Sequence, residues 1–228
     1  NFRNTVSTLK SEKEKYANLW FVMQEKQQKM EVWLTAPLHS LNAETVANEA
    51  DNYRRAMIKA VKLFQGDDCQ APNNAATSLK DEMNKFCKEY SPLMELMCTR
   101  GLQKRHWDTM NEVTGLSMKY LPDATLQQAI DYGLHKEIEK IEETCVNASK
   151  EFSLEKALDT MEEEWKEMQF VAKPYKDSGT YILSSVDEIQ QILDDQIVRS
   201  QAMRGSRYVK PFEKRVTTWE KTLNDLQE

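Results

Sequence analysis

Apolar residues recur at the spacing of an α-helix along most of this chain, which restricts it to folds built from packed helices. Residues 153–168 are the clearest case, because charged residues such as Lys156 and Glu163 lie off their apolar stripe. We expect Ser153 to cap this helix, since its hydroxyl can accept hydrogen bonds from the free amides of the first turn. The stripe consists of Leu154, Ala157, Leu158, Met161, Trp165 and Met168.

The next stretch departs from helical spacing and predicts a β-hairpin. Residues 175–179 have the composition of a turn, and Gly179 can adopt a positive φ at no steric cost. Residues 180–183, which include Tyr181, are of the types enriched in strands. Pro174 cannot donate a hydrogen bond to a neighbouring strand, so we expect the first strand to lie at an edge.

Glycine and proline are too rare for an all-β fold. The 228 residues include only 6 Gly and 6 Pro, whereas a fold made of short strands needs many turns. The sequence therefore predicts a mostly α protein, an elongated array of helical bundles with one small β-hairpin near residues 168–183. We expect two subdomains. Residues 1–100 would hold a long antiparallel helix pair and short helices, and residues 101–228 would hold the inserted hairpin.

Start and stop signals divide the rest of the chain into helices. We expect an exposed loop at residues 65–74, because this stretch is polar and rich in turn residues. Ser91 followed by Pro92 indicates the start of a short helix, and Ser185 with Glu188 matches a capping box. The expected helices comprise residues 1–34, 42–65, 79–90, 93–99, 103–113, 125–132, 134–152, 153–168, 185–204 and 210–226.

Charge and cysteine content exclude several kinds of partner and site. The formal net charge is -6, and the clustered basic surface that nucleic acids or anionic membranes require is not evident. The four cysteines form no CxxC pair and have no zinc-ligand spacing with His39 or His135, which favours a reduced, cytosolic environment. The longest apolar run is far shorter than the ~20 residues of a membrane span.

Three short motifs could form a functional site, and for each a structural role is favoured. Arg105-His106-Trp107 contains a possible base, but no serine, cysteine or paired carboxylate accompanies it. The acidic run Glu162–Glu164 could dock on a basic surface, although such runs are more often solvated helix faces. Residues 204–207 could bind a phosphate through backbone amides, but the chain lacks GxxxxGK[ST] and GxGxxG. We therefore expect neither catalysis nor ATP binding.

The motifs of the C-terminal half resemble, in type and order, the linker region of dynein heavy chains, and they are closer to axonemal than to cytoplasmic ones. The matching pieces are Arg105-His-Trp107, Ser153-Leu-Glu-Lys-Ala-Leu158, Glu164-Trp-Lys166, Pro174-Tyr-Lys-Asp-Ser-Gly-Thr-Tyr-Ile-Leu183, Val186-Asp-Glu-Ile189, Gln201-Ala-Met-Arg-Gly-Ser206 and Lys210-Pro-Phe212. The residues that we expect to have structural or mechanical roles are Arg105, His106, Trp107, Trp165, Tyr175, Gly179, Tyr181, Arg204, Gly205, Pro211 and Phe212.

The resemblance implies a mechanical function. Dynein heavy chains are ATP-driven microtubule motors built on a ring of AAA+ modules, and their linker is a helical lever arm that transmits changes of the ring to the tail. We expect this chain to be a monomeric fragment of such a protein, cytoplasmic or cytoskeletal and located in the ciliary axoneme. Its partner would be the ring of the same heavy chain, and ATP, Mg²⁺ and microtubules would bind elsewhere. The alternative is a spectrin-like helical scaffold or coiled-coil interaction module.

Overall fold

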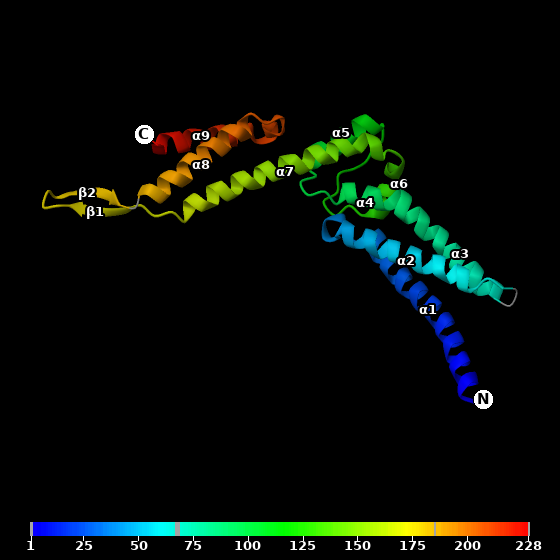
Figure 1. The fold of residues 1–228 in the computed structure, drawn as a ribbon. Helices are drawn as coiled ribbons and strands as arrows, with labels where there is room; N and C mark the ends of the chain where they lie inside the picture. The colour runs from blue at the N-terminus through cyan, green and yellow to red at the C-terminus, as the bar shows by residue number, and fades with distance from the viewer. Residues whose placement is uncertain (1, 67–68, 185, 228) are drawn as a thin grey trace. The chain divides into compact units, whose positions relative to one another are not determined.

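The computed structural model describes residues 2–66, 69–184 and 186–227, and 79% of the chain is helical. The sheet found in these residues is one antiparallel hairpin, so the predicted mostly α fold with one β-hairpin is confirmed. The chain forms two compact units, residues 1–146 (unit 1) and 147–228 (unit 2), which Figure 1 shows in colour order. The sequence predicts a boundary at residue 100, whereas residues 101–146 pack in unit 1, because side chains such as Trp107 and Leu126 belong to its core.

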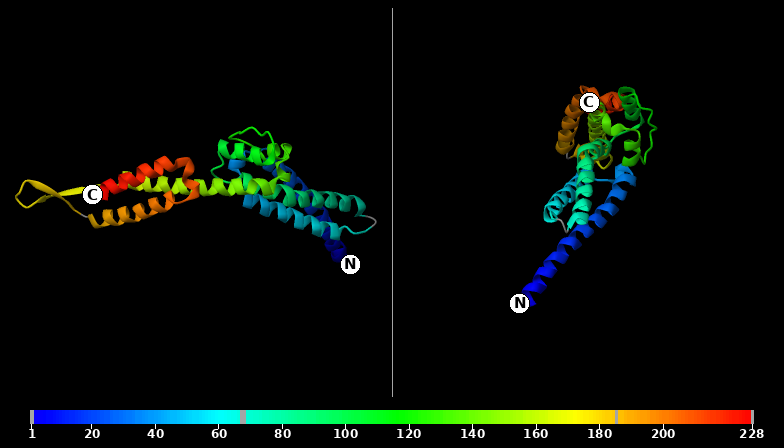
Figure 2. Two further views of the ribbon diagram at one scale, coloured as in Figure 1. Left: turned by 90° about the horizontal axis from the view of Figure 1, so that it is seen from above. Right: turned by 90° about the vertical axis from the view of Figure 1, so that its right-hand side faces the viewer.

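Unit 1 consists of helices joined by turns and by a longer irregular segment at residues 115–125. Its helices α2 and α3 make the most extensive contact and lie side by side in both views of Figure 2. The elements are α1 (Phe2–Thr35), η1 (Leu38–Ser40), α2 (Ala43–Leu63), α3 (Gln70–Lys85), the π-helical turn η3 (Phe86–Tyr90), α4 (Ser91–Met97), α5 (Lys104–Thr114), α6 (Leu126–Asp131), η4 (Leu134–Lys136) and the first part of α7 (Ile138–Lys166).

The long helices α1 and α2 are antiparallel, as the sequence predicts. Tyr16, in the first half of α1, meets Phe64 at the end of α2, with ring centroids 5.1 Å apart. Trp33, near the end of α1, meets Tyr53 in the middle of α2 at 6.1 Å. Aromatic contacts therefore join the start of one helix to the end of the other, and they hold the register of the pair.

Local signals account for several helix ends. The Oδ1 atom of Asn42 accepts a hydrogen bond from the Thr45 amide at 2.8 Å, so Asn42 caps α2. Thr125 caps α6 in the same way. Gly115 and Gly133, at the ends of α5 and α6, have φ values of 74° and 82°, a conformation that glycine adopts without the steric cost of a Cβ atom.

Two predicted breaks in unit 1 are wrong. α3 already begins at Gln70, so much of the expected loop at residues 65–74 is helical; residues 67 and 68 lie outside the described part of the chain. Asn73 supports this start, because its side-chain amide donates to the Val61 carbonyl at 2.9 Å. Ser91 is not a helix cap: its φ of -61° is helical, and the π-helical turn η3 leads from α3 into α4.

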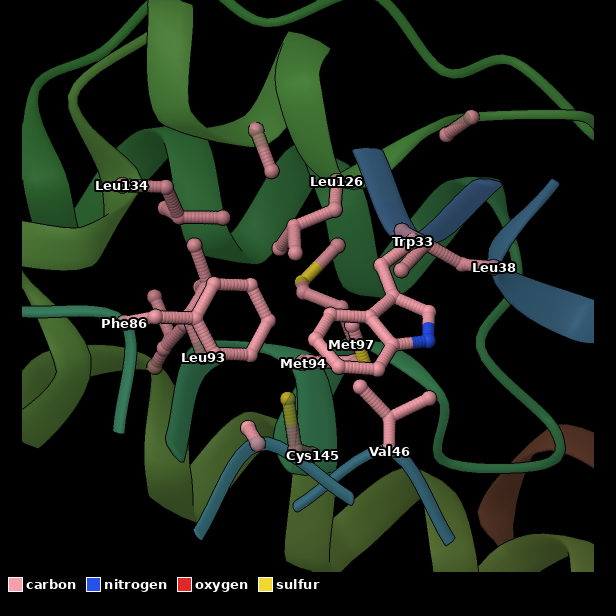
Figure 3. Packing of buried hydrophobic residues seen from close by; sticks show 14 of the residues in the cluster. Trp33, Leu38, Val46, Phe86, Leu93, Met94, Met97, Leu126, Leu134 and Cys145 are labelled. Atoms are coloured by element: carbon pink, nitrogen blue, oxygen red, sulfur yellow. The ribbon is translucent and has the colours of Figure 1, made fainter. Parts of the chain in front are cut away.

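A broad apolar cluster forms the core of unit 1 and is drawn in Figure 3. At its centre the rings of Trp33 and Phe86 have centroids 5.3 Å apart. Leu126 of α6, Leu134 of η4 and Cys145 of α7 point into the same cluster. Segments as far apart in sequence as Met30 and Cys145 thus share one core, which is why residues 101–146 belong to this unit.

Unit 2 contains the last part of α7, the strands β1 (Val171–Tyr175) and β2 (Thr180–Ser184), α8 (Val186–Arg204), the 3₁₀ turn η5 (Arg207–Phe212) and α9 (Glu213–Gln227). α8 and α9 pack closely against each other. Two small apolar clusters join the three helices. One contains Leu158, Met161, Met203, Val209 and Val216, and the other contains Leu193, Ile197 and Leu223.

The predicted start of a helix at Ser153 is also wrong. The sequence predicts a new helix that begins with Ser153 as its cap, but Ser153 lies inside α7, and its hydroxyl donates to the Ser149 carbonyl at 2.9 Å. No glycine or proline occurs between Ile138 and Lys166, so nothing in this stretch forces a break. Ala157, which the sequence places on the apolar stripe, is exposed.

The hairpin forms as predicted, three residues later than its expected start. Val171 pairs with Ser184 and Tyr175 with Thr180, and Gly179 has a φ of 71° in the turn. Pro174 lies in β1, which is an edge strand. The predicted capping box before α8 involves Ser185, which lies outside the described residues.

Candidate functional site

The Arg105-His106-Trp107 motif stabilises the start of α5. The His106 ring accepts a hydrogen bond from the Gln103 amide through Nδ1 at 3.0 Å, in a capping box with the Gln103 side chain. Arg105 donates to the Gln103 side chain. Trp107 is buried and meets the Tyr120 ring edge-on at 6.1 Å. This geometry suits packing and helix capping.

The side chains that can bind metal ions do not gather in the described part of the chain. It contains no group of three or more His, Cys, Asp or Glu residues that could hold a metal ion. Burial raises the pKa of the Cys98 thiol to about 11 and that of Cys145 to about 12. Both thiols are therefore protonated near neutral pH, a form that does not bind metals. In the part of the chain that the structure describes, no helix is both long enough and apolar enough to span a membrane.

Trp165 ties α7 to α8 through a polar network. Its indole Nε1 donates to the Gln196 side chain at 2.8 Å, and Gln196 in turn donates to Glu164 at 2.7 Å. Gln196 is only 1% exposed, so both hydrogen bonds offset the cost of burying its amide. The Trp165 ring itself is half-buried, against the cluster around Leu193 and Leu223.

The hairpin does not cover Trp165. Every residue of β1 and β2 is exposed except Ser184, which is half-buried. Tyr175 is 44% exposed and Tyr181 is 69% exposed. A hairpin that folded over the indole would bury one of its faces. In the structure, apolar side chains of α8 and α9 contact Trp165 instead.

Arg215 of α9 links two carboxylates of α7. It donates to Asp159 at 2.7 Å and to both oxygens of Glu162, at 2.9 and 2.6 Å. Hydrogen bonds from Arg215 and then Lys156 lower the pKa of Asp159 below its usual value. Glu162 and Glu164, in the acidic run that the sequence analysis regards as a solvated face, thus contact other helices of the same chain.

In the turn between α8 and α9, the residues that the sequence singles out make structural contacts. Arg204 donates to Glu220 at 2.8 Å, which joins the end of α8 to α9. The amides of Gly205 and Ser206 donate to carbonyls of α8, and the Ser206 hydroxyl accepts from the Tyr208 amide. These groups are therefore not free to surround a phosphate. Pro211 lies inside η5, and Phe212 packs against the cluster that contains Val209.

Four residues that link the helices of unit 2 carry no signal of this role at their own positions in the sequence: Gln196, Tyr208, Arg215 and Glu220. Each of the four has a partner more than ten residues away, and none stands in a recognisable motif. The acidic run beside Trp165 is a weak signal for them, since its carboxylates can pair with a cation of another helix.

Comparison with known proteins gives one consistent result. The family model for the dynein heavy chain, N-terminal region 2, matches residues 6–228. Human dynein axonemal heavy chain 3 is 37% identical over 93% of this chain, and mouse dynein axonemal heavy chain 1 is 34% identical over 98% of it. Rat dynein axonemal heavy chain 12 is 37% identical over 86%. The chain spans only 5–6% of the length of these relatives. It therefore belongs to the dynein heavy chain family, within N-terminal region 2.

Proposed function

We propose that this chain is a mechanical segment of the linker, or lever arm, of an axonemal dynein heavy chain. In this role it transmits conformational changes of the AAA+ ring of the same heavy chain towards the tail. The protein would act in the cytoskeleton of the ciliary axoneme. The family match and the names of the relatives support the motor assignment.

The observation that carries the lever role is the unbroken helix α7. Ile141 and Cys145 of α7 belong to the core of unit 1, and Leu158 and Met161 belong to a core cluster of unit 2. The boundary between the two units thus falls inside a 29-residue helix that contains no glycine or proline. A helix transmits force along its axis, whereas a glycine- and serine-rich linker behaves as a random coil.

The side-chain network of unit 2 supports the same role. Arg215 joins α9 to α7, Trp165 with Gln196 joins α8 to α7, and Arg204 joins α8 to α9. Each pair of helices is therefore held by directional contacts in addition to apolar packing. Such contacts resist sliding of one helix along another, which a lever requires.

We propose that ATP and Mg²⁺ bind in other parts of the heavy chain and that this segment acts as a monomer within it. The 228-residue chain carries no phosphate-binding loop motif. Titration calorimetry with Mg-ATP tests this directly, and we expect no binding heat. Micromolar binding would contradict the assignment of ATP to other regions.

The lever role is tested by interrupting α7 in the whole motor. About ten Gly/Ser residues inserted after Val146 would form a coil whose ends are separated by about 17 Å on average. We expect ATP turnover to persist, because it depends on the ring, and microtubule gliding driven through the tail to slow or stop. Both are measured on the same preparation.

A matched control carries the same insertion between Ser178 and Gly179, in the exposed hairpin turn. This variant adds the same flexible residues but leaves α7 intact, so it should glide at the unmodified speed. Unmodified gliding by the α7 variant would show that this helix does not carry force.

A further inference from the structure

The turn between α8 and α9 is strongly basic in an acidic chain. Residues 204–215 contain five basic residues and one acidic residue, a formal net charge of +4, whereas the whole chain has a net charge of -6. The basic residues are Arg204, Arg207, Lys210, Lys214 and Arg215, and the acidic one is Glu213. Charge of one sign concentrated in so short a segment creates a local field that attracts the opposite sign.

Only part of this charge is neutralised within the fold. Arg204 is paired with Glu220, and Arg215 with Asp159 and Glu162. Among the described residues, Arg207, Lys210 and Lys214 have no carboxylate partner, and all three are exposed. Elsewhere in unit 2, basic residues are commonly paired. Lys156 pairs with Asp159, Lys166 with Glu163 and Arg199 with Asp195.

Tyr208 brings Arg207 together with one further cation, Lys150. Arg207 donates to the Tyr208 hydroxyl at 2.7 Å, and Lys150 of α7 donates to it at 3.2 Å. Both cations also lie near the ring face, 4.7 and 5.0 Å from its centroid. The ring thus orders the two side chains before any partner arrives, which reduces the entropy cost of binding.

Lys210 and Lys214 extend this group of cations along one side of η5 and α9. Arg207, Lys210 and Lys214 follow one another at intervals of three and four residues on consecutive helical turns of η5 and α9, so their side chains lie on one side of the segment. Lys214 also borders a shallow hollow of about 380 Å³, lined on α9 by Thr218 and Trp219. We call Lys150, Arg207, Tyr208, Lys210 and Lys214 the basic platform.

We propose that the basic platform is a docking surface for an acidic segment, rich in Glu or Asp, of a partner protein. Charge complementarity identifies the occupant, because exposed cations without a carboxylate partner in the fold attract carboxylates, and tyrosine and arginine are, with tryptophan, the residues enriched in binding hot spots. A membrane surface is less suited, since residues 199–225 expose no large apolar side chain that could insert into lipid.

The experiment measures binding of a fluorescein-labelled peptide of twelve glutamates to the 228-residue protein by fluorescence anisotropy. We expect binding that weakens as salt increases. The variant Arg207→Glu/Lys210→Glu/Lys214→Glu should bind at least about tenfold more weakly. Tyr208→Ala leaves the net charge unchanged and should weaken binding about threefold, because the ring that orders Lys150 and Arg207 is lost.

The control variant is Lys10→Glu/Lys13→Glu/Lys15→Glu, which changes the net charge by the same amount at exposed positions of α1. It should bind within about twofold of the unmodified protein. Equal weakening by both triple variants, or no binding by the unmodified protein, would overturn the proposal. If the protein co-sediments with phosphatidylserine-containing vesicles but does not bind the peptide, the basic platform is a membrane-binding surface, and the proposal is overturned. None of these outcomes bears on the lever role, because no motor activity is measured.

Discussion

The two units of this chain are stabilised by different kinds of contact. Unit 1 has a broad apolar core in which aromatic and methionine side chains from most of its helices meet. Unit 2 has two small apolar clusters, and its helices are joined by hydrogen bonds and ion pairs of Trp165, Arg204 and Arg215. Unit 1 is not free of buried charge, since Lys26 pairs with Glu82, but that pair lies beside a much larger core.

The comparison shows how a helical protein can distribute its stability. The free energy of apolar burial does not depend on direction. A large core therefore stabilises a unit without fixing the exact position of each helix against its neighbours. Hydrogen bonds and ion pairs add less free energy but depend on direction. We therefore expect unit 1 to respond to core substitutions, and unit 2 to respond to pH and salt as well. Hydrogen exchange, resolved by peptide, assigns each change in stability to one unit.

The largest effect should come from a cavity in unit 1. Phe86 is 1% exposed and lies against Trp33 and Tyr90. Phe86→Ala should destabilise unit 1 by about 3–5 kcal/mol, with protection of unit 2 amides unchanged. Val113→Ala, at an exposed position of α5, is the control and should change stability by about 0.5 kcal/mol or less.

Trp165 should have the next largest effect, on unit 2. Because the ring is half-buried, Trp165→Ala should cost about 1–3 kcal/mol, less than a fully buried tryptophan. Trp165→Phe keeps most of the ring but leaves Gln196 without its donor, and should cost about 1 kcal/mol. Urea denaturation measures both. Equal losses for the two variants would mean that the hydrogen bond, and not the ring, provides the stabilisation.

Removal of the Arg215 contacts should have a smaller effect. Arg215→Ala should destabilise unit 2 by about 1 kcal/mol, because the pairs with Asp159 and Glu162 are partly screened by solvent. The loss should shrink at high salt. Arg199→Ala removes a pair within α8 only and should cost no more than about 0.5 kcal/mol.

Acid should weaken unit 2 through Asp159. Its pKa is lowered in the folded protein, so its contribution to stability is complete above the ordinary value of 3.8 and is lost as pH falls through the lower folded value. Asp51 of unit 1 behaves similarly, but its arginine partners lie in the same helix. Asp159→Asn should therefore flatten the acid dependence of unit 2 alone. An unchanged acid profile would show that this pair does not contribute.

The smallest effect should come from Gly205. Its φ is not positive, and an added Cβ would meet only the Ala202 and Gln201 carbonyls at 3.6 and 3.8 Å. Gly205→Ala should change the stability of unit 2 by no more than about 0.5 kcal/mol. Gly133→Ala, where φ is 82°, should cost unit 1 about 1 kcal/mol. A large loss at Gly205 would mean that the turn needs a conformation that the structure does not show.

The sequence by itself determined what depends on neighbouring residues. Asn42 caps α2, Gly133 ends α6 and Gly179 allows the hairpin turn, because each acts on backbone groups within a few residues. Helical spacing of apolar residues likewise predicted the mostly α fold. The ordered motifs of the C-terminal half predicted the family, since several matches in fixed order are specific even without a structure.

Only the tertiary structure decided what depends on distant partners. Arg215 meets carboxylates 53 and 56 residues away, and nothing in the sequence selects these from the other acidic residues of the chain. The unbroken α7 was missed for a related reason. Ser153 is a good cap in isolation, but inside a helix its hydroxyl bonds to the Ser149 carbonyl instead. Residues of α7 on both sides of Ser153 pack in apolar clusters, and no glycine or proline lies between them to break the helix.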